Sequence, residues 1–522
     1  MENGKSLALA PSLLALCPLL FVLHSGSSIG NSELLGSSLN SSPSKTKNFL
    51  YYLILLLLFA AGIWFILARG SSLNASRPAV NSSTGPVAAA TSSPLASAPT
   101  SQTYLSKVLR ENLRSPLSIL LLQIIVIIIV ARIFAAFFRR IGQPPVMGEM
   151  VAGIVLGPSL LGWLWPQTMA LLFPPTSMGA LSLLSQIGVV LFMFVVGMEL
   201  DLEHLREKAT SAIMVSHASI IVPFLLGTSL ALVIYTPLEP ANTSFTAFAL
   251  FMGIAMSITA FPVLARILED RGLAKTSLGS TAIACAAVDD VTAWCILAFV
   301  IAIVKSTGVA ASVATILLVL LFIGAMLFVV KPRLARLITE RAENQKYSKG
   351  LLAGILAFVL ACAWFTESIG IHALFGAFLA GVVMPSVSGV RFFLKEKLEV
   401  FSSAALLPLF FAFTGLRTEI RLLNDWAGWL MCLCIIVVAV AGKLGGSMLM
   451  ARWTRMSWHD SVAIGVLMNT RGLVELVVLN IGYDLGILSA RIFVMMVIMA
   501  LATTFMTAPL LSILKLKSHA EV

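Results

Sequence analysis

The feature that most constrains the fold is a series of apolar runs from residue 116 to residue 514, separated by short polar segments. A transmembrane helix needs about 20 predominantly apolar residues, and most of these runs reach or approach that length. The composition agrees, because 58% of the residues are hydrophobic and 11% are charged. Soluble domains carry about 25% charged residues. The sequence therefore predicts an all-α integral membrane protein.

Thirteen of these runs are predicted to form the helices of a membrane core. They span 116–138, 147–165, 178–200, 211–235, 244–268, 277–304, 310–331, 351–367, 371–385, 402–416, 426–450, 460–483 and 490–514. The membrane domain then covers 116–515, and a short tail follows at 516–522.

The first 115 residues form an extension to this core. Residues 1–48 include an apolar stretch at 7–23 after Lys5, a pattern typical of a signal-peptide core or a membrane anchor. The run at 49–68 is long enough to span a bilayer and predicts an extra transmembrane helix. Residues 69–115 are rich in Ser, Ala, Pro and Thr, which predicts a flexible linker.

The placement of Lys and Arg predicts the orientation of the core. If the first core helix starts outside the cell, the cytoplasmic loops and tail carry twenty Lys and Arg residues, and the outer loops carry four. Cytoplasmic loops are enriched in these residues, so the C-terminus is expected inside. The same loops account for the net charge of +11, and no nucleic-acid partner is expected.

Two short segments resemble each other seven helices apart. "LFMFVVGMELDL" (191–202) ends the third run, and "LFFAFTGLRTEI" (409–420) ends the tenth. Each has an apolar, aromatic stretch followed by Gly and a polar cluster. Because seven is odd, the two copies face opposite ways across the membrane. Inverted repeats of this kind are typical of secondary transporters.

The repeat pairs the fifth run with the twelfth, and polar or helix-breaking residues interrupt both. Thr259 and Pro262 interrupt the fifth, where Pro lacks the backbone N–H that a continuous helix needs. The twelfth is interrupted at the matching depth by Asn469, Thr470, Arg471 and Gly472. Interrupted helices at corresponding positions of two halves are the best sequence indication of a transporter binding site. We therefore expect two discontinuous helices near that site.

Among the ionisable residues of the apolar runs, five of the sixth, eleventh and twelfth runs stand out: Asp289, Asp290, Lys443, Arg471 and Glu475. At roughly 3 kcal/mol each, they would cost on the order of 15 kcal/mol if left unpaired. They must therefore be paired, neutral or next to water. Arg471 and Glu475 are four residues apart and can pair on one helix face. Adjacent residues point about 100° apart on a helix, so one aspartate can face Lys443 while the other binds a ligand.

The pairing of these groups has two solutions. A salt bridge between Asp289 and Lys443 is favoured, because each would otherwise be a lone charge in the membrane. The alternative pairs Asp289 with Arg471 and Lys443 with Glu475. Glu367, in the eighth run, can line the same pathway or lie at its outer mouth.

The six cysteines show no spacing of a zinc or redox site. Most lie within apolar runs, where cysteine acts as a small apolar residue. Cys432 and Cys434 are the pair close enough in sequence to suggest a metal site, but apolar packing is favoured for them too. No cofactor is expected, and no metal other than a transported ion.

Residues 115–515 resemble the monovalent cation:proton antiporter-2 family. The resemblance lies in "GQPPVMGEMVAGIVLGPSLLG" (142–162), "SITAFPVLARIL", "AAVDDVTAW", "GAFLAGVVMP", "FFAFTGLRTEI", "AGKLGG" and "MNTRGLVELVVLNIG", which occur in the family's order. The detail is similar to plant cation/H⁺ exchangers and their bacterial relatives, and the membrane plan is similar to the NapA type.

The resemblance implies a thirteen-helix core with inverted repeats, two crossed discontinuous helices, and a dimerising scaffold beside a mobile transport bundle. It also implies that Asp290 is the cation and proton carboxylate, that Asp289 pairs with Lys443, and that Thr259 lies at the crossing. The expected cation- and proton-binding residues are Asp290, Asp289 and Thr259. The supporting polar network would contain Asn469, Thr470, Arg471, Glu475 and Glu367. Because the chain ends soon after the last run, control by a C-terminal nucleotide-binding domain is not expected.

The sequence thus predicts a secondary antiporter, not an enzyme, that exchanges H⁺ for Na⁺ or K⁺. A carboxyl group suits this exchange, since it is neutral when protonated and attracts a small cation when ionised. Electrogenic exchange is favoured, and the expected setting is a homodimer in a bacterial inner membrane. The alternative is a cation channel or gated K⁺ efflux pathway on the same fold, with the carboxylates attracting cations.

Overall fold

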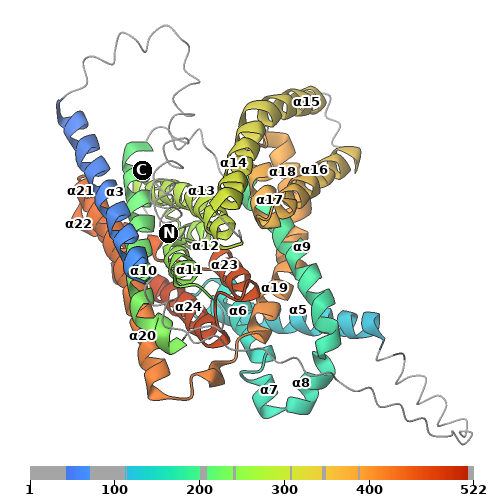
Figure 1. Cartoon of the computed structure of the whole chain (residues 1–522). Helices are drawn as coiled ribbons and strands as arrows, with labels where there is room; N and C mark the ends of the chain where they lie inside the picture. Colours follow the sequence, from blue (N-terminus) through green and yellow to red (C-terminus); the bar gives the residue numbers. More distant parts are fainter. Residues whose placement is uncertain are drawn as a thin grey trace, which may run out of the picture.

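The computed structural model describes residues 43–70, 112, 115–199, 209–238, 243–305, 309–343, 349–385 and 388–514. This part of the chain is built from helices, as predicted. Most of the predicted N-terminal segment, almost all of the predicted linker and the tail at 516–522 lie outside the described residues. Figure 1 shows the arrangement of the helices.

Each predicted core run has a helical counterpart. These helices are α5 (Pro116–Arg140), α6 (Pro145–Leu156), α9 (Pro175–Glu199), α10 (Ala209–Leu238), α11 (Phe245–Ser257) with α12 (Phe261–Asp270), α13 (Ser277–Lys305), α14 (Val309–Gly324), α16 (Lys349–Ser368), α17 (Ala373–Val382), α19 (Leu407–Leu416), α20 (Trp426–Val440) with α21 (Gly446–Trp453), α22 (Trp458–Met468) with α23 (Leu473–Asp484), and α24 (Ala490–Ile513).

The other helical segments of the described residues lie outside these counterparts. They are α3 (Pro43–Gly70), α7 (Leu161–Leu164), α8 (Pro166–Leu172), α15 (Lys331–Glu343), α18 (Ser388–Phe401), the 3₁₀ helix η6 (Ile420–Leu422), and the π-helical segments η4 (Ala325–Val330), η5 (Ser402–Leu406) and η7 (Ala441–Gly445).

In the described chain, eleven helical segments are long and apolar enough to cross a membrane, and α22 with α23 makes a twelfth that bends by 43°. The ninth predicted helix, α17, has only 10 residues. It is shorter than the predicted 371–385 because it begins after a turn with Gly370 at φ +87° and ends before Pro385. With this short helix included, the predicted count of thirteen is confirmed.

Both predicted helix breaks are present. Residues 258–260 separate α11 from α12, and residues 469–472 separate α22 from α23. Pro262 explains the first break, since its ring would clash with the carbonyl of Ile258 in a continuous helix. In its actual position Pro262 lies in the first turn of α12, where no N–H is required.

The helices pack as two bundles. The crossing bundle contains α10–α13 and α20–α24, and both broken helices lie within it. The flanking bundle contains α5, α6, α9 and α16–α19. In Figure 1 the crossing bundle occupies the left and centre of the molecule, and the flanking bundle lies to the right and below.

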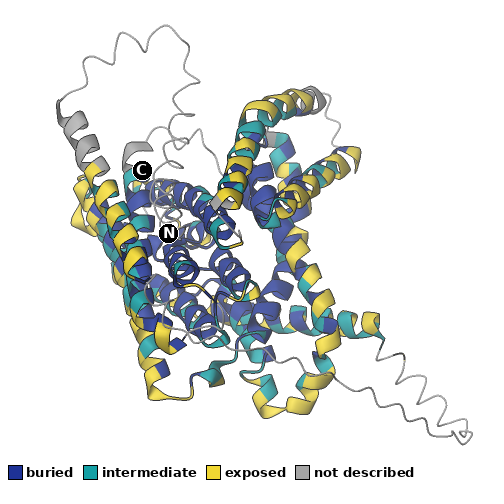
Figure 2. Cartoon of the chain, in the orientation of Figure 1, coloured by how far each residue is buried: buried dark blue, intermediate teal, exposed yellow. Residues whose placement is uncertain are grey.

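The centre of the crossing bundle is the most deeply buried part of the described chain. The most apolar window of α11–α12 is 94% buried and that of α13 is 83% buried, against 22% for α5. Figure 2 shows these buried helices surrounded by helices with exposed outer faces. Apolar side chains on those faces are the surface that a bilayer would cover.

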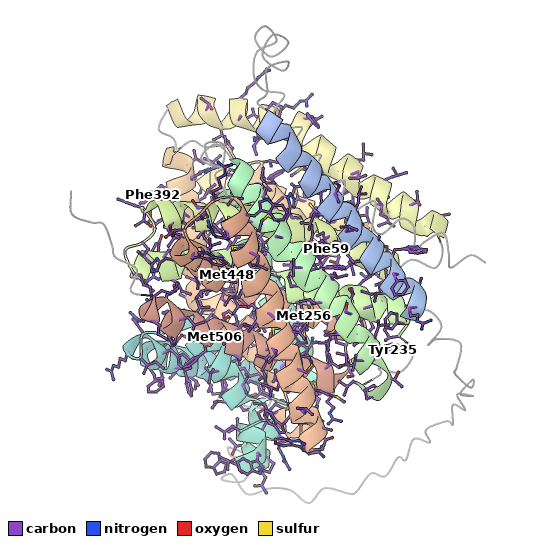
Figure 3. The ribbon with its side chains drawn as sticks, turned by 90° about the vertical axis from the view of Figure 1, so that its left-hand side faces the viewer. Phe59, Tyr235, Met256, Phe392, Met448 and Met506 are labelled. Carbon is purple, nitrogen blue, oxygen red and sulfur yellow. The ribbon has the colours of Figure 1, made fainter. Side chains whose placement is uncertain are left out.

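The predicted extra helix at 49–68 is α3, which spans Pro43–Gly70. It packs along α10 and reaches the start of α11, and Figure 3 shows it lying diagonally across α10 with Phe59 on its length. The close approach of α3 to α10 depends on Gly62, because a Cβ at this position would lie 3.2 Å from a Leu225 methyl. The helix is confirmed, and its passage through the membrane stays a prediction.

Candidate functional site

The two breaks cross and bond to each other. The backbone N–H of Ala260 donates to the carbonyl of Thr470 at 3.0 Å, and the Thr259 hydroxyl lies 3.2 Å from the carbonyl of Met468. The second break passes very close to α12, since a Cβ added at Gly472 would lie 2.7 Å from a Val263 methyl. The crossing that the family resemblance implied is therefore confirmed.

Asp289 lies beside the crossing and is fully partnered. Its Oδ2 is 2.8 Å from the Lys443 ammonium, and both side chains are 0% exposed. The Thr259 hydroxyl also donates to Oδ2. The hydroxyls of Ser216 and Ser219, both on α10, donate to its two oxygens at 3.3 Å. The predicted salt bridge is confirmed, and this carboxylate ties α13 to three other segments.

Lys443 has a partner for each of its three donors. Besides Asp289, its ammonium donates to the carbonyl of Ser219 at 2.9 Å and to that of Ser257. It projects from η7, a π-helical turn inside the long α20–α21 helix. Such turns are often found at functional sites. The ammonium is therefore satisfied without water.

Arg471 and Glu475 form the second buried ion pair, with Nη1 3.0 Å from Oε2 and both side chains 0% exposed. The guanidinium also donates to the carbonyls of Ala255 at 2.8 Å and Met256 at 2.7 Å. Because Arg471 pairs with Glu475, the alternative in which it takes Asp289 is wrong.

Asp290 contrasts with its neighbour. It is 0% exposed, and neither carboxyl oxygen has a hydrogen-bond partner among the described residues. Its side chain points away from that of Asp289 because adjacent positions on α13 are about 100° apart. The structure therefore holds one aspartate in a network and leaves the other available.

The remaining polar residues of the second break serve different purposes. The Asn469 amide donates to the carbonyl of Thr503 at 3.5 Å, while its buried Oδ1 has no partner in the described chain. The Thr470 hydroxyl donates within its own turn, to the carbonyl of Leu467 at 2.7 Å. Asn469 Oδ1 is thus an acceptor without a partner in the described chain, like the carboxyl oxygens of Asp290, whereas the Thr470 hydroxyl is hydrogen-bonded within its own turn.

Glu367 belongs to a different place. Its Oε2 accepts the backbone N–H of Ala373 at 2.8 Å, which caps the start of α17. It lines a cavity of about 350 Å³ at the end of the bundles, together with Lys305, His372 and Asp484. Glu367 therefore lies near the ends of α13, α16 and α23, and its place in the transport pathway stays a prediction.

Sequence reasoning missed the serines that support the ion pairs. Ser216, Ser219 and Ser257 lie within otherwise ordinary apolar helices, and their roles depend on long-range packing. Thr504 of α24 was also missed, although its hydroxyl accepts the N–H of Arg471 at 3.0 Å and donates to the carbonyl of the same residue at 2.8 Å. Their only signal was polarity inside an apolar run.

No group of three or more His, Cys, Asp or Glu side chains that could hold a metal occurs in the part of the chain that the structure describes. Cys432 is buried and Cys434 is exposed, so the two thiols do not face one site. The chemistry available at the crossing is therefore that of carboxylates and backbone carbonyls.

Comparison with known proteins gives consistent matches. The family described as "Sodium/hydrogen exchanger, transmembrane" matches residues 124–514. The chain is 44% identical over 395 residues to the Na(+)/H(+) antiporter NhaS4 of Synechocystis, covering 76% of this chain and 96% of that protein.

Two eukaryotic relatives are longer. The chain is 40% identical over 405 residues to cation/H(+) antiporter 17 of Arabidopsis thaliana, covering 77% of this chain and 49% of the relative. It is 32% identical over 420 residues to K(+)/H(+) antiporter 1 of Saccharomyces cerevisiae, covering 78% and 48%. The chain thus spans about half the length of these two proteins.

Among solved structures, the sodium proton antiporter MjNhaP1 from Methanocaldococcus jannaschii matches with a TM-score of 0.56. The match covers 76% of this chain and 98% of that one, at 14% sequence identity. At this identity the likeness establishes the fold.

Proposed function

The chain belongs to the sodium/hydrogen exchanger family of transporters, and from that premise we propose that it is a secondary antiporter that exchanges H⁺ for Na⁺ or K⁺. The transporting unit is the multi-pass membrane domain at 116–515. The relatives named above are Na⁺/H⁺, K⁺/H⁺ and cation/H⁺ antiporters, which favours exchange over the channel alternative.

The observation that carries this proposal is the unpartnered carboxyl of Asp290. A lone ionised carboxylate in a membrane interior costs several kcal/mol, whereas a protonated one or one that binds a cation avoids most of this. Asp290 therefore holds either a proton or a cation, and not both. Competition at one group couples the two fluxes.

The crossing supports this role of Asp290. Broken helices supply carbonyls and dipole ends at mid-membrane, which are suitable ligands for a dehydrated cation. The partner-free Oδ1 of Asn469 is a further acceptor beside the second break. Movement of the crossing bundle against the flanking bundle then exposes Asp290 to each side in turn.

Electrogenic exchange follows if Lys443 also titrates. Cation binding at Asp290 brings a positive charge towards the Asp289–Lys443 pair. If Lys443 then releases its proton, two protons move for each monovalent cation and the membrane potential drives the exchange. A buried lysine can release a proton near neutral pH, so this step is physically feasible.

We place the protein in a bacterial inner membrane, with the C-terminus in the cytoplasm and with two chains forming a homodimer. The support for the orientation is the excess of Lys and Arg in the loops assigned to the cytoplasm. The exposed apolar face of α5, with Leu117, Ile125 and Ile133 each more than half exposed, offers a surface for a second copy or for lipid.

Proton flux in proteoliposomes tests the proposal. We expect addition of Na⁺ or K⁺ to collapse an imposed pH gradient in wild-type vesicles, with Li⁺ compared in the same assay. We expect the rate of Na⁺-driven exchange to change with an imposed membrane potential. Absence of any cation-dependent proton flux would reject the antiporter, and a rate that ignores the potential would reject electrogenic exchange alone.

A further inference from the structure

A group of contacts joins the two bundles at one end of the molecule. Arg417 follows α19, which belongs to the flanking bundle, and Asp484 ends α23, which belongs to the crossing bundle. Nη1 of Arg417 lies 2.7 Å from Oδ1 of Asp484 and donates to Oδ1 of Asn480 at 3.2 Å. The Asn480 amide donates to the Thr414 hydroxyl on α19 at 2.8 Å.

Aromatic rings strengthen this bridge. The guanidinium of Arg417 lies 4.1 Å from the ring centroid of Phe413 and 5.5 Å from that of Tyr483. A guanidinium within about 6 Å of a ring face is attracted by it. Arg417 therefore contacts Asp484, Asn480 and Tyr483 of α23. The ring of Phe413, on the preceding helix α19, helps to hold the guanidinium in place.

The bridge stands at the edge of the interface between the bundles. The cavity of about 350 Å³ described above is lined by Arg417 and Asp484, and also by Lys305, Glu367 and His372. A second, narrower pocket next to it is lined by Phe413, Asn480 and Asp484. Both cavities are therefore lined by residues of the two bundles.

We propose that Thr414, Arg417, Asn480 and Asp484 form an inter-bundle latch that opposes opening of the interface at this end. This inference rests on the proposed exchange, in which the bundles move against each other. An attraction across a cleft favours the closed arrangement at that end and must break before the cleft opens. In the proposed orientation this is the outer end, opposite the C-terminal end of α24.

The free energy of the latch contacts determines how far their loss shifts the equilibrium between the closed and open arrangements. A partly exposed ion pair and a hydrogen bond together change a conformational equilibrium about threefold to tenfold. The apparent affinity for a ligand decreases when a smaller fraction of the protein is in the conformation that binds it. Removal of the latch therefore lowers the apparent KM for a cation supplied from the outer side, and leaves the inner side little changed.

A second ion pair at the same end provides a matched control. Arg491 and Asp425, at the starts of α24 and α20, are bonded to each other, and both lie within the crossing bundle. Their side chains are 31% and 46% exposed, close to the 21% and 46% of Arg417 and Asp484. Loss of this pair removes a similar contact without joining or separating the bundles.

The first measurement is sided transport in proteoliposomes of known orientation, with Na⁺ and with K⁺. We expect Arg417→Gln to lower the outer apparent KM about threefold to tenfold, and the reversed pair R417D/D484R to recover part of that change, because it restores the ion pair without the contacts to Asn480 and the rings. Arg491→Gln should leave both sides unchanged. Equal shifts on both sides, or no shift in Arg417→Gln while the wild type exchanges normally, would overturn the latch and leave the antiporter intact.

The second measurement does not need transport. Spin labels at Leu183 of α9 and Trp426 of α20, both exposed, report the distance between the bundles in a chain whose Cys17, Cys295 and Cys434 are replaced by alanine. We expect Arg417→Gln to move the distance distribution to longer values and Arg491→Gln to leave it in place. An unchanged distribution in both variants would reject the latch, even in a protein that shows no exchange.

Discussion

The C-terminal end of α11 and the surroundings of Asp290 are neighbouring regions of one buried centre, yet they treat charge in opposite ways. The end of α11 receives Lys443 on the carbonyl of Ser257, and Arg471 on those of Ala255 and Met256. Each cation has its own carboxylate, at 2.8 Å and 3.0 Å. Asp290 has neither a cation nor a donor within the described residues.

The contrast separates charges that hold the fold from a carboxyl that has no ion pair within the described residues, and in the proposed electrogenic exchange Lys443 adds a titration to its part in the fold. The end of a helix carries a partial negative charge, so two cations stabilise the interrupted α11, and their carboxylates balance them. Every member of that region would be left with a buried, uncompensated charge if its partner were lost. Asp290 has no hydrogen-bond partner within the described residues, so its loss should leave the fold unchanged and affect only the exchange.

The largest expected effect is therefore on transport. We expect Asp290→Asn to abolish cation-driven proton flux, because an amide can neither hold the exchanged proton nor balance a cation. The thermal stability in detergent should match that of the wild type, since no contact is lost. Asp270→Asn, which alters an exposed carboxylate paired with Arg266, is the control. Wild-type flux in Asp290→Asn would break the contrast between the two regions.

The next effect is on stability. Asp289→Asn leaves the Lys443 ammonium buried without its counter-ion, and we expect it to destabilise the protein by about 3–5 kcal/mol. Asp289→Asn combined with Lys443→Met removes both charges and should recover most of that loss. Unfolding in detergent with increasing denaturant measures both. A stable Asp289→Asn protein would show that the pair does not hold the centre together.

Arg471 tests the same region from the other side of the crossing. Arg471→Gln loses two bonds to α11 carbonyls and strands Glu475, so we expect a loss of about 3 kcal/mol. Arg471→Lys should recover only part of it, because one ammonium cannot reproduce the planar fork that reaches both carbonyls and the carboxylate. Full recovery by lysine would mean that charge alone matters at this end of α11.

Much of this centre could be predicted from the sequence, because the membrane makes its physical signals strong. Five ionisable residues in apolar runs had to be explained, and the spacing of Arg471 and Glu475 fixed one pair at once. Pro262 and the polar segment at 469–472 predicted the two helix breaks. The partner of Asp289 was a choice between two cations, and the structure favours Lys443.

What was not predictable depends on register and on distant packing. The sequence "AGKLGG" does not predict that residues 441–445 form a π-helical turn. This turn determines the direction in which the Lys443 side chain projects. Ser219 and Ser257 lie on different helices, and their carbonyls meet at the ammonium only in the folded bundle. Glu367 is an ionisable residue in an apolar run, but it lies in the last turn of α16, where its carboxylate accepts the N–H of Ala373 at the start of α17.

The smallest expected effect compares the two breaks themselves. Thr259 and Thr470 are both 0% exposed, but the Thr259 hydroxyl donates to Asp289 on α13, whereas that of Thr470 donates within its own turn, to the carbonyl of Leu467. A hydrogen bond to a buried charged group is worth about 1.5–3 kcal/mol, and one between neutral groups about 0.5–1.5 kcal/mol.

Thr259→Ala should therefore destabilise the protein by about 2 kcal/mol, and Thr470→Ala by about 1 kcal/mol or less. Exchange should survive in both, because neither hydroxyl contacts Asp290 in the structure. Denaturant unfolding measures the first claim, and proton flux in vesicles measures the second. If Thr259→Ala loses exchange as completely as Asp290→Asn while keeping its stability, then Asp289 takes part in the ion exchange itself, and the division between a paired region and a working carboxylate is wrong.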